Sequence, residues 1–164
     1  MNDKPRLTVC GAGAAGLAIA ADNALKGLEV TLFELPAFAA KLAAARRFGG
    51  IEVTADSETT AGKTGFARLA DITDDPAEAA AGADVVMITA PAMYHDVFMD
   101  AFAPHLRAGQ IVLFNTGYWG SLRQARRLRG VLPDVTLAES NIMPYICQPR
   151  GDAINIGRFK RHFC

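Results

Sequence analysis

The chain alternates short apolar runs with segments whose apolar residues recur at helical spacing. The first run covers residues 7–10, and the next segment places Leu17, Ala21 and Ala24 on one helical face before Gly27. A continuously apolar run such as ADVVMIT, residues 83–89, is typical of a strand buried on both faces of a sheet. We expect strands at residues 7–10, 29–34, 83–89, 110–114 and 135–138, alternating with helices at residues 14–26, 36–48, 74–81, 92–102 and 121–128.

Two regions depart from this alternation. Residues 51–56 and 65–72 predict two short strands around a polar turn, and residues 145–159 predict two strands around a Pro-Arg-Gly-Asp turn. Alternating strands and helices predict an α/β fold with a doubly wound, mostly parallel sheet. At 164 residues the chain has the length of one ordinary domain. We therefore expect a single domain over residues 1–164, with a small β-hairpin insertion.

The segment VCGAGAAGLAIAADNALKGLEVTLFE contains three glycines in the pattern G-x-G-x-x-G. The pattern follows a predicted strand, opens a predicted helix and is followed by Glu34 at the end of the next strand, which is the context of a dinucleotide-binding turn. Gly11 permits the tight turn, Gly13 lets a pyrophosphate approach the backbone, and Gly16 lets the helix pack closely. This predicts a Rossmann-type fold in which the cofactor contacts Gly11, Ala12, Gly13, Ala14, Ala15, Gly16 and Glu34.

Glu34 also bears on which cofactor binds. A carboxylate at this position accepts the ribose hydroxyls and repels a 2′-phosphate, which favours NAD(H) over NADP(H). Arg46 and Arg47 lie at the far end of the second predicted helix, so we expect them to be solvated. The glycine segment also resembles the FAD-binding turn of flavoprotein monooxygenases and reductases, and by itself it does not separate the two cofactors.

Composition excludes several classes of partner. The 17 basic and 17 acidic residues balance, so we expect neither nucleic-acid nor membrane-surface binding. No apolar run reaches the roughly 18–20 residues of a membrane helix, and the start of the chain does not resemble a signal peptide. The three cysteines, Cys10, Cys147 and Cys164, lack metal-ligand spacing. We expect a reduced, cytoplasmic protein without a metal site.

Later segments resemble the nucleotide domain of the opine dehydrogenases. ITAPAMYHDVF resembles the loop that passes near the nicotinamide in that family, and FNTGYWGSLRQARRL and AESNIMPYICQPRGDAINIGRFK resemble the segments that follow it. The resemblance extends from Leu7 to Lys160. It implies that Ala90, Pro91 and Ala92 contact the cofactor. Asn115, at the end of a buried strand, either contacts nicotinamide, ribose or substrate, or caps a turn.

The resemblance implies an NAD(P)H-dependent reductive condensation. The family joins an amino acid to a 2-oxo acid such as pyruvate and reduces the imine by hydride transfer from the cofactor. Its catalytic histidine, paired with an acid, lies in a second, mainly helical domain after the nucleotide domain. We therefore interpret this chain as the N-terminal half of such an enzyme, inactive alone and with no catalytic residue of its own. An exposed apolar face around residues 143–147 is expected to promote homodimers.

Several polar and aromatic residues remain open candidates. His95 is either an acid–base group or, by preference, a surface or capping residue, whereas His105 and His162 are expected to be solvated or at a domain junction. Tyr118 and Trp119 either line a substrate cleft or cover a helix. The arginines of the 121–128 helix and its end form either a solvated face or an anion site: Arg123, Arg126, Arg127 and Arg129. The resemblance places Tyr145, Ile146 and Arg150 near the second domain.

Two rival functions share the predicted fold. One is a relative of ketopantoate reductase or glycerol-3-phosphate dehydrogenase. The other is a stand-alone NAD-sensing module, like the regulatory domains that gate ion transport. The hairpin at residues 51–72 and the segment after Ala138 argue against the sensor.

Overall fold

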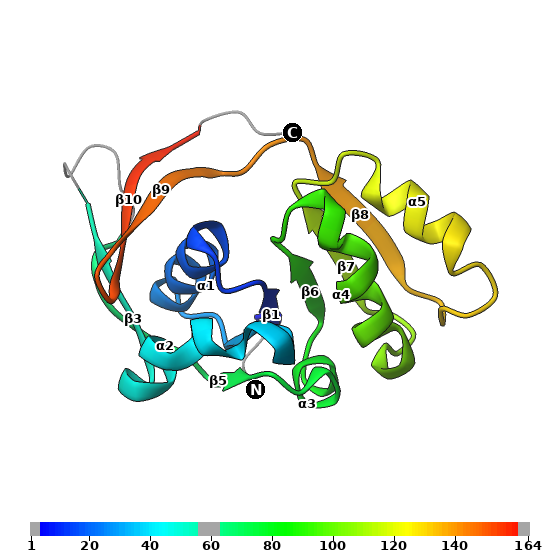
Figure 1. Cartoon of the computed structure of the whole chain (residues 1–164), viewed down its shortest axis with the longest axis horizontal. Coiled ribbons are helices and arrows are strands. Elements are labelled where there is room, and N and C mark those ends of the chain that lie inside the picture. The colour runs from blue at the N-terminus through cyan, green and yellow to red at the C-terminus, as the bar shows by residue number, and fades with distance from the viewer. Residues whose placement is uncertain (1–3, 56–62, 161–164) are drawn as a thin grey trace.

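The computed structural model describes residues 4–55 and 63–160, and its centre is a sheet of parallel strands. The strand order is β5-β2-β1-β6-β7-β8, and every neighbouring pair is parallel. The order runs outward from β1 in both directions, so the switch point lies between β1 and β6 (Figure 1). The strands are β1 Leu7–Cys10, β2 Val30–Phe33, β5 Asp71–Thr73, β6 Val85–Ile88, β7 Ile111–Asn115 and β8 Thr136–Ser140.

Helices cover both faces of this sheet, which explains the continuously apolar strands. Val9 and Leu32 belong to an apolar cluster with α1, whereas the next residues along the strands, Cys10 and Phe33, belong to a second cluster with α3 and α4. The α-helices are α1 Ala14–Leu25, α2 Ala43–Phe48, α3 Pro76–Ala81, α4 His95–Phe102 and α5 Gly120–Arg127, and the short 3-10 helices are η1 Pro36–Leu42, η2 Ala92–Tyr94 and η3 Ala103–His105. None of the described helices is long and apolar enough to cross a membrane.

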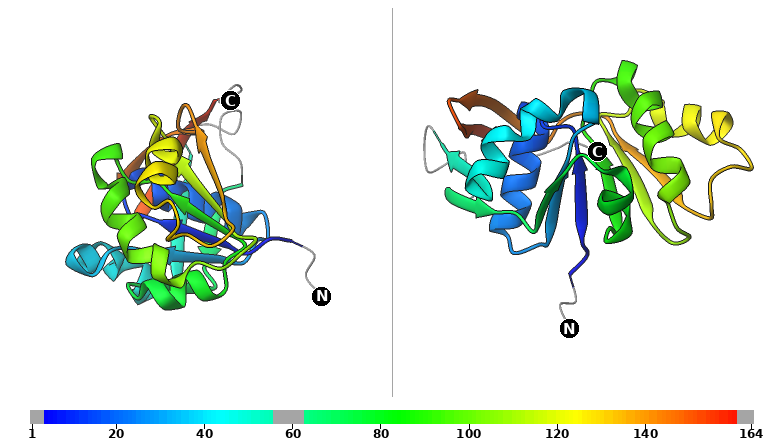
Figure 2. Two further views of the ribbon diagram at one scale, coloured as in Figure 1. Left: turned by 90° about the vertical axis from the view of Figure 1, so that its right-hand side faces the viewer. Right: turned by 60° about the horizontal axis from the view of Figure 1, so that its bottom comes forward.

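A second, four-stranded sheet lies on the other side of α1, so that α1 is between the two sheets (Figures 1 and 2). Its order is β4-β3-β10-β9, with antiparallel hairpins joined by a parallel pairing of β3 with β10. Its strands are β3 Gly50–Thr54, β4 Gly65–Arg68, β9 Tyr145–Arg150 and β10 Ala153–Phe159. The Tyr145 hydroxyl donates to Asp22 Oδ2 at 2.5 Å, which ties β9 to the middle of α1.

The predicted fold class is confirmed, and three details differ. The segment predicted as one strand over residues 65–72 divides in two. The Leu69 N–H still bonds to Gly49, the residue before β3 of the second sheet. The Ala70 N–H bonds to Val30, and β5 then pairs with β2 in the main sheet. The two predicted hairpins also form one sheet. Finally, the predicted helices over residues 36–48 and 92–102 each begin as a 3-10 helix, one starting at Pro36 and the other directly after Pro91.

Candidate functional site

The glycine turn connects β1 to α1 at the carboxyl edge of the main sheet. Gly11 has a φ of 108°, a conformation that a side chain would strain. A Cβ at Gly16 would lie 1.7 Å from the Gly11 carbonyl oxygen, so the helix reaches this distance only because Gly16 has no side chain. Gly13 is exposed, and a Cβ there would meet no atom within 4 Å, so the space beside its backbone is open.

The N-terminus of α1 is suited to an anion. Its first turn contains no acidic residue, and the N-cap Gly13 provides no side-chain hydrogen bond to the backbone amides. Ala14 and Ala15 are half-buried, whereas Gly16 is buried. Because N–H groups of the first helical turn lack partners within the helix and carry partial positive charge, this end of α1 favours a phosphate.

Glu34 follows β2 and lies beside the glycine turn. Its side chain is buried, and its carboxylate accepts hydrogen bonds from the Ala12 N–H and the Leu35 N–H, both at 3.0 Å. Lys41 of η1 has a half-exposed side chain, and its Nζ lies 3.4 Å from Glu34 Oε2. The predicted acid is therefore adjacent to the predicted turn, and donors of the chain itself use three of the about four acceptor positions of its carboxylate.

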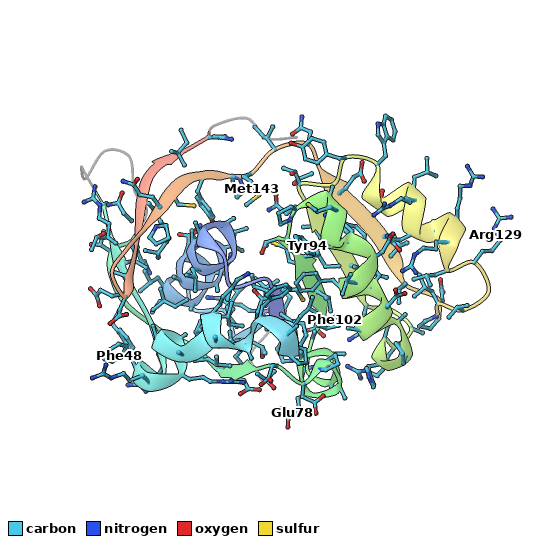
Figure 3. All side chains as sticks on the ribbon, in the orientation of Figure 1. Phe48, Glu78, Tyr94, Phe102, Arg129 and Met143 are labelled. Carbon is cyan, nitrogen blue, oxygen red and sulfur yellow. The ribbon has the colours of Figure 1, made fainter. Side chains whose placement is uncertain are left out.

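The two arginines near Glu34 in sequence have partners other than Glu34. Arg46 forms an ion pair with Asp74, and that guanidinium, first through its hydrogen bond, lowers the pKa of the Asp74 carboxyl. The Arg47 guanidinium lies over the Phe48 ring at 5.1 Å, at the end of α2 labelled in Figure 3.

The loop after β6 is fastened to the glycine turn by Thr89. The Thr89 hydroxyl lies 2.8 Å from the Cys10 carbonyl oxygen and 3.2 Å from that of Gly11. The next three residues are those predicted to contact the cofactor. Ala90 and Ala92 are half-buried, and Pro91 is exposed. The structure thus brings this loop and the glycine turn together. The sequence analysis did not identify Thr89 as a residue of the site, although a hydroxyl residue at the end of an apolar run could have indicated it.

An aromatic contact joins the loops that follow β2 and β6. Phe38 in η1 meets Tyr94 in η2 edge-on, with ring centroids 6.1 Å apart, and Lys41 Nζ lies 4.7 Å from the Phe38 ring centre. Tyr94 lies between the α1 side and the α4 side of the molecule (Figure 3). The loops that follow the two neighbours of β1 therefore contact each other at the carboxyl edge of the sheet.

Asn115 is buried at the end of β7. Its Oδ1 accepts the Ser140 hydroxyl at 2.7 Å, and its Nδ2 lies 3.8 Å from the Met87 sulfur. The side chain is therefore fixed between β6 and β8. Contact with a ligand stays a prediction for this residue, and its partner Ser140 was not identified from the sequence.

The turn after β7 exposes two aromatic rings. Tyr118 and Trp119 have exposed fractions of 73% and 75% and left-handed backbone conformations. The Glu139 carboxylate accepts the N–H groups of Trp119 and Ser121 and the Ser121 hydroxyl. Burial raises the pKa of Glu139, but these hydrogen bonds outweigh it and hold the pKa below its ordinary value. Glu139 thus holds the start of α5 as an anion, a role that the sequence did not reveal.

His95 is not the surface residue that we predicted, because its side chain is fully buried at the start of α4. Its Nε2 lies 3.2 Å from the Ala90 carbonyl oxygen, and its ring packs on Phe114 with centroids 4.9 Å apart. Burial lowers the pKa of His95, and the hydrogen bond to Ala90 opposes that effect. The neighbouring Asp96 is not its partner, because the Asp96 carboxylate lies 3.0 Å from Arg123 Nη2.

The other candidates lie away from the glycine turn. His105 is exposed in η3, and His162 lies outside the described residues. Arg123 and Arg127 pair with acids of α4, which supports the solvated-face interpretation of α5, and Arg129 points outward at its end (Figure 3). Arg150 is exposed where β9 ends. Within residues 4–55 and 63–160, no group of His, Cys, Asp and Glu has the arrangement of a metal site.

The expectation of an exposed apolar face at residues 143–147 is largely wrong. Tyr145 is buried, and Met143 and Cys147 pack against the apolar cluster around α1 (Figure 3). Ile146 is the exception, with an exposed fraction of 56%. The reason is the second sheet, which turns this segment onto α1 and was not foreseen.

Comparisons with known proteins identify the family and the fold of this chain. The model of the family described as acetohydroxy acid isomeroreductase, NADPH-binding domain, matches residues 2–131. An opine dehydrogenase from Arthrobacter sp. (strain 1C) is 29% identical over 150 residues, covering 90% of this chain and 40% of the relative. The chain therefore spans less than half of the length of that relative.

Solved structures share the fold. Octopine dehydrogenase in complex with NADH and agmatine matches with a TM-score of 0.81 at 23% identity, over 96% of this chain and 40% of that chain. NADP⁺-bound yersinopine dehydrogenase gives 0.76 at 15%, over 99% and 41%. The 2-dehydropantoate 2-reductase from Porphyromonas gingivalis W83 gives 0.70 at 20%, over 96% and 53%. The resemblance to opine dehydrogenases is thus confirmed.

The family match and the geometry of the glycine turn lead to one conclusion. This chain belongs to the acetohydroxy acid isomeroreductase NADPH-binding domain family, and its fold is the NAD(P)-binding fold found in the opine dehydrogenases.

Proposed function

We propose that residues 1–164 form the NAD(H)-binding domain of an opine-dehydrogenase-like oxidoreductase. The observation that carries this proposal is the convergence of three features at the switch point of the sheet. These are the uncapped N-terminus of α1 with open space at Gly13, the acid Glu34, and the loop held by Thr89. Ligands of open α/β sheets bind in the crevice at such a switch point.

Each part has a role toward the cofactor. The first-turn amides of α1 and the Gly13 backbone would hold the pyrophosphate, and residues 90–92 would lie along the nicotinamide half. Glu34 would hold the adenosine ribose, because a carboxylate has about four acceptor positions and the described contacts use three. The bound cofactor supplies hydride transfer, while the protein supplies position and charge.

The choice of NAD(H) over NADP(H) rests on Glu34, whose negative charge opposes a 2′-phosphate. Lys41 partly offsets that charge from 3.4 Å away. The solved relatives include both an NADH complex and an NADP⁺ complex. We therefore propose a preference for NADH that is measurable rather than absolute.

The proposed reaction is the reductive condensation of an amino acid with a 2-oxo acid. Among the described residues, His95 is buried and Asp96 is engaged by Arg123, so they do not form an acid–base pair at the crevice. We accordingly place the catalytic histidine and its acid outside this chain and propose that the chain alone has no turnover. The free thiols of Cys10 and Cys147 are compatible with a cytoplasmic location.

A ketopantoate-reductase-like function is the second candidate, and the structural likeness to 2-dehydropantoate 2-reductase favours it. The two candidates share the cofactor and differ in the oxo substrate. In a longer version of the protein, reduction of ketopantoate without an amino acid would replace the leading proposal. NADH oxidation that requires both pyruvate and an amino acid would support the leading proposal.

The cofactor proposal is tested by titrating the chain with NADH, NADPH and FAD, beside Glu34→Ala. Glu52→Ala is the matched control, since Glu52 is an exposed acid of β3. We expect NADH to bind about tenfold more tightly than NADPH, a difference of about 1.4 kcal/mol. Glu34→Ala removes that difference and Glu52→Ala leaves it. Binding of FAD alone, or an unchanged preference in Glu34→Ala, would contradict the proposal.

A further inference from the structure

One buried side chain is left without a complete set of partners. His95 Nδ1 is the buried side-chain nitrogen or oxygen for which residues 4–55 and 63–160 provide no hydrogen bond. The imidazole is fully buried at the first position of α4. Because buried polar atoms nearly always have partners, this exception calls for an explanation in terms of what the ring does.

The partner of the other ring nitrogen fixes the protonation state. Nε2 lies 3.2 Å from the Ala90 carbonyl oxygen, which can only accept a hydrogen bond. Nε2 therefore carries the hydrogen, and in the neutral ring Nδ1 is the atom without one. A neutral imidazole tolerates this position far better than a cation with a second unpaired donor.

Nδ1 faces Gly120, the first residue of α5. A Cβ at Gly120 would lie 2.6 Å from His95 Nδ1 and 3.5 Å from the Phe114 ring, so the backbone of the β7–α5 turn closes directly over the imidazole. There is no room there for a side chain, and the described residues place no acceptor at this point.

His95 is thus the link between two loops of the carboxyl edge. The glycine turn is held to Thr89, Thr89 precedes Ala90, the Ala90 carbonyl accepts from His95, and His95 packs against Gly120 and Phe114. The first loop contains residues 90–92, and the second contains Tyr118 and Trp119.

We propose that neutral His95, with its hydrogen on Nε2, is a positioning residue that sets residues 90–92 and the β7–α5 turn for the nicotinamide half of the cofactor. This inference rests on the proposed function, because the position of these loops matters only if they contact the bound cofactor. His95 itself touches neither cofactor nor substrate in this role; it acts through the Ala90 carbonyl and the Gly120 backbone.

The charges around the ring give this role a pH dependence. Arg123 of α5 disfavours a second positive charge, whereas Asp96 of α4 and Glu139 of β8 favour it. Burial outweighs them, and the pKa of His95 lies below its ordinary value of 6.5. Protonation would add a donor at Nδ1 where Gly120 provides no acceptor, so the two loops would have to separate.

The sign of the stability effect follows from this lowered pKa. Above about pH 6.5 the ring is neutral in both the folded and the unfolded chain, and the stability contributed by neutral His95 is fully present. As the pH falls below that value the unfolded chain binds the proton first, so the free energy of unfolding decreases.

The test compares wild type, His95→Gln and His95→Phe. Glutamine retains an amide donor for Ala90 without titrating, and phenylalanine fills the space without a donor. His105→Gln is the matched control, because His105 is exposed in η3. NADH affinity is measured from about pH 5 to about pH 8. The ¹⁵N shifts of the imidazole rings report the tautomer of His95 in the wild-type chain.

We expect wild-type affinity to fall at acid pH by up to about tenfold per pH unit, the limit for one proton. His95→Gln flattens that dependence, His95→Phe binds more weakly at every pH, and His105→Gln behaves as wild type. His95 shows the Nε2–H tautomer at neutral pH. A cationic His95 or an Nδ1–H tautomer at neutral pH, or an unchanged pH profile in His95→Gln, would overturn this inference alone. Absence of nicotinamide-cofactor binding by wild type would instead overturn the proposed function, and with it this role.

Discussion

Two buried carboxylates, Asp22 within α1 and Glu34 after β2, are held in different ways. Asp22, in the middle of α1, accepts from two side chains, the Tyr145 hydroxyl at 2.5 Å and Lys26 Nζ at 2.6 Å. Glu34, after β2, accepts from the backbone amides of Ala12 and Leu35 and has Lys41 nearby. Both acids are almost fully buried, and each has a half-exposed lysine beside it.

The difference shows what each acid is for. Tyr145 belongs to β9, which is more than a hundred residues away in sequence, so Asp22 joins the second sheet to α1. Burial, followed by the hydrogen bond to Asp22, raises the pKa of Tyr145 and keeps its hydroxyl a donor. The Glu34 side chain contacts no element of the second sheet; its donors are the Ala12 amide of the glycine turn, the adjacent Leu35 amide and Lys41 of η1. Burial alone therefore does not identify a binding acid; the identity of its donors does.

The largest expected effect comes from substitution of Gly16, in the glycine turn that Glu34 contacts through Ala12. In Gly16→Ala the new Cβ would overlap the Gly11 carbonyl, so we expect a loss of more than about 3 kcal/mol in the free energy of unfolding. Gly13→Ala is the matched control, because a Cβ there meets nothing within 4 Å. It should leave stability nearly unchanged and weaken cofactor binding. Urea unfolding of both variants provides the measurement, and equal losses in the two would refute the packing argument.

Loss of Asp22 should come next in size and affect stability without affecting the cofactor. Asp22→Ala removes the acceptor of a buried hydroxyl and is expected to cost about 2–3 kcal/mol. Tyr145→Phe should cost less, and the double variant should show coupling between the two positions. NADH affinity should stay at the wild-type value in folded protein. A cofactor defect in Asp22→Ala comparable to that of Glu34→Ala would erase the distinction between the two acids.

The two lysines give the smallest and sharpest contrast. Lys41→Ala removes the positive charge beside Glu34, so NADPH should weaken relative to NADH by about two- to threefold, within the range of exposed ion pairs. Lys26→Ala removes the equivalent partner of Asp22 and should not change the ratio of the two affinities. Equal shifts in both variants would indicate a general charge effect rather than a local one. Paired titrations at low ionic strength measure this difference.

The features that could be predicted from the sequence are those determined by residues close together in the chain. The strand at residues 7–10, the glycine turn and Glu34 follow from spacing and residue type within one βαβ unit. Gly16 could be assigned a packing role because helix and strand are adjacent in the chain.

The parts that escaped prediction depend on distant partners. Val53 pairs with Ile154, and no local pattern indicates that these strands are neighbours. The burial of His95 likewise depends on Phe114 and Gly120, which the topology of the sheet brings to it. The expectation of an exposed apolar face near Tyr145 was wrong for the same reason. This segment belongs to the second sheet, which packs it against α1.

The location of the cofactor site is tested most directly by mapping the backbone amide shifts of the ¹⁵N-labelled chain on addition of NADH. We expect the largest shifts in residues 11–16, Leu35 and residues 90–92, with little change at Asp22 and Tyr145. Shifts concentrated on the second sheet, or an unresponsive glycine turn in a chain that binds NADH, would contradict the assignment of the site.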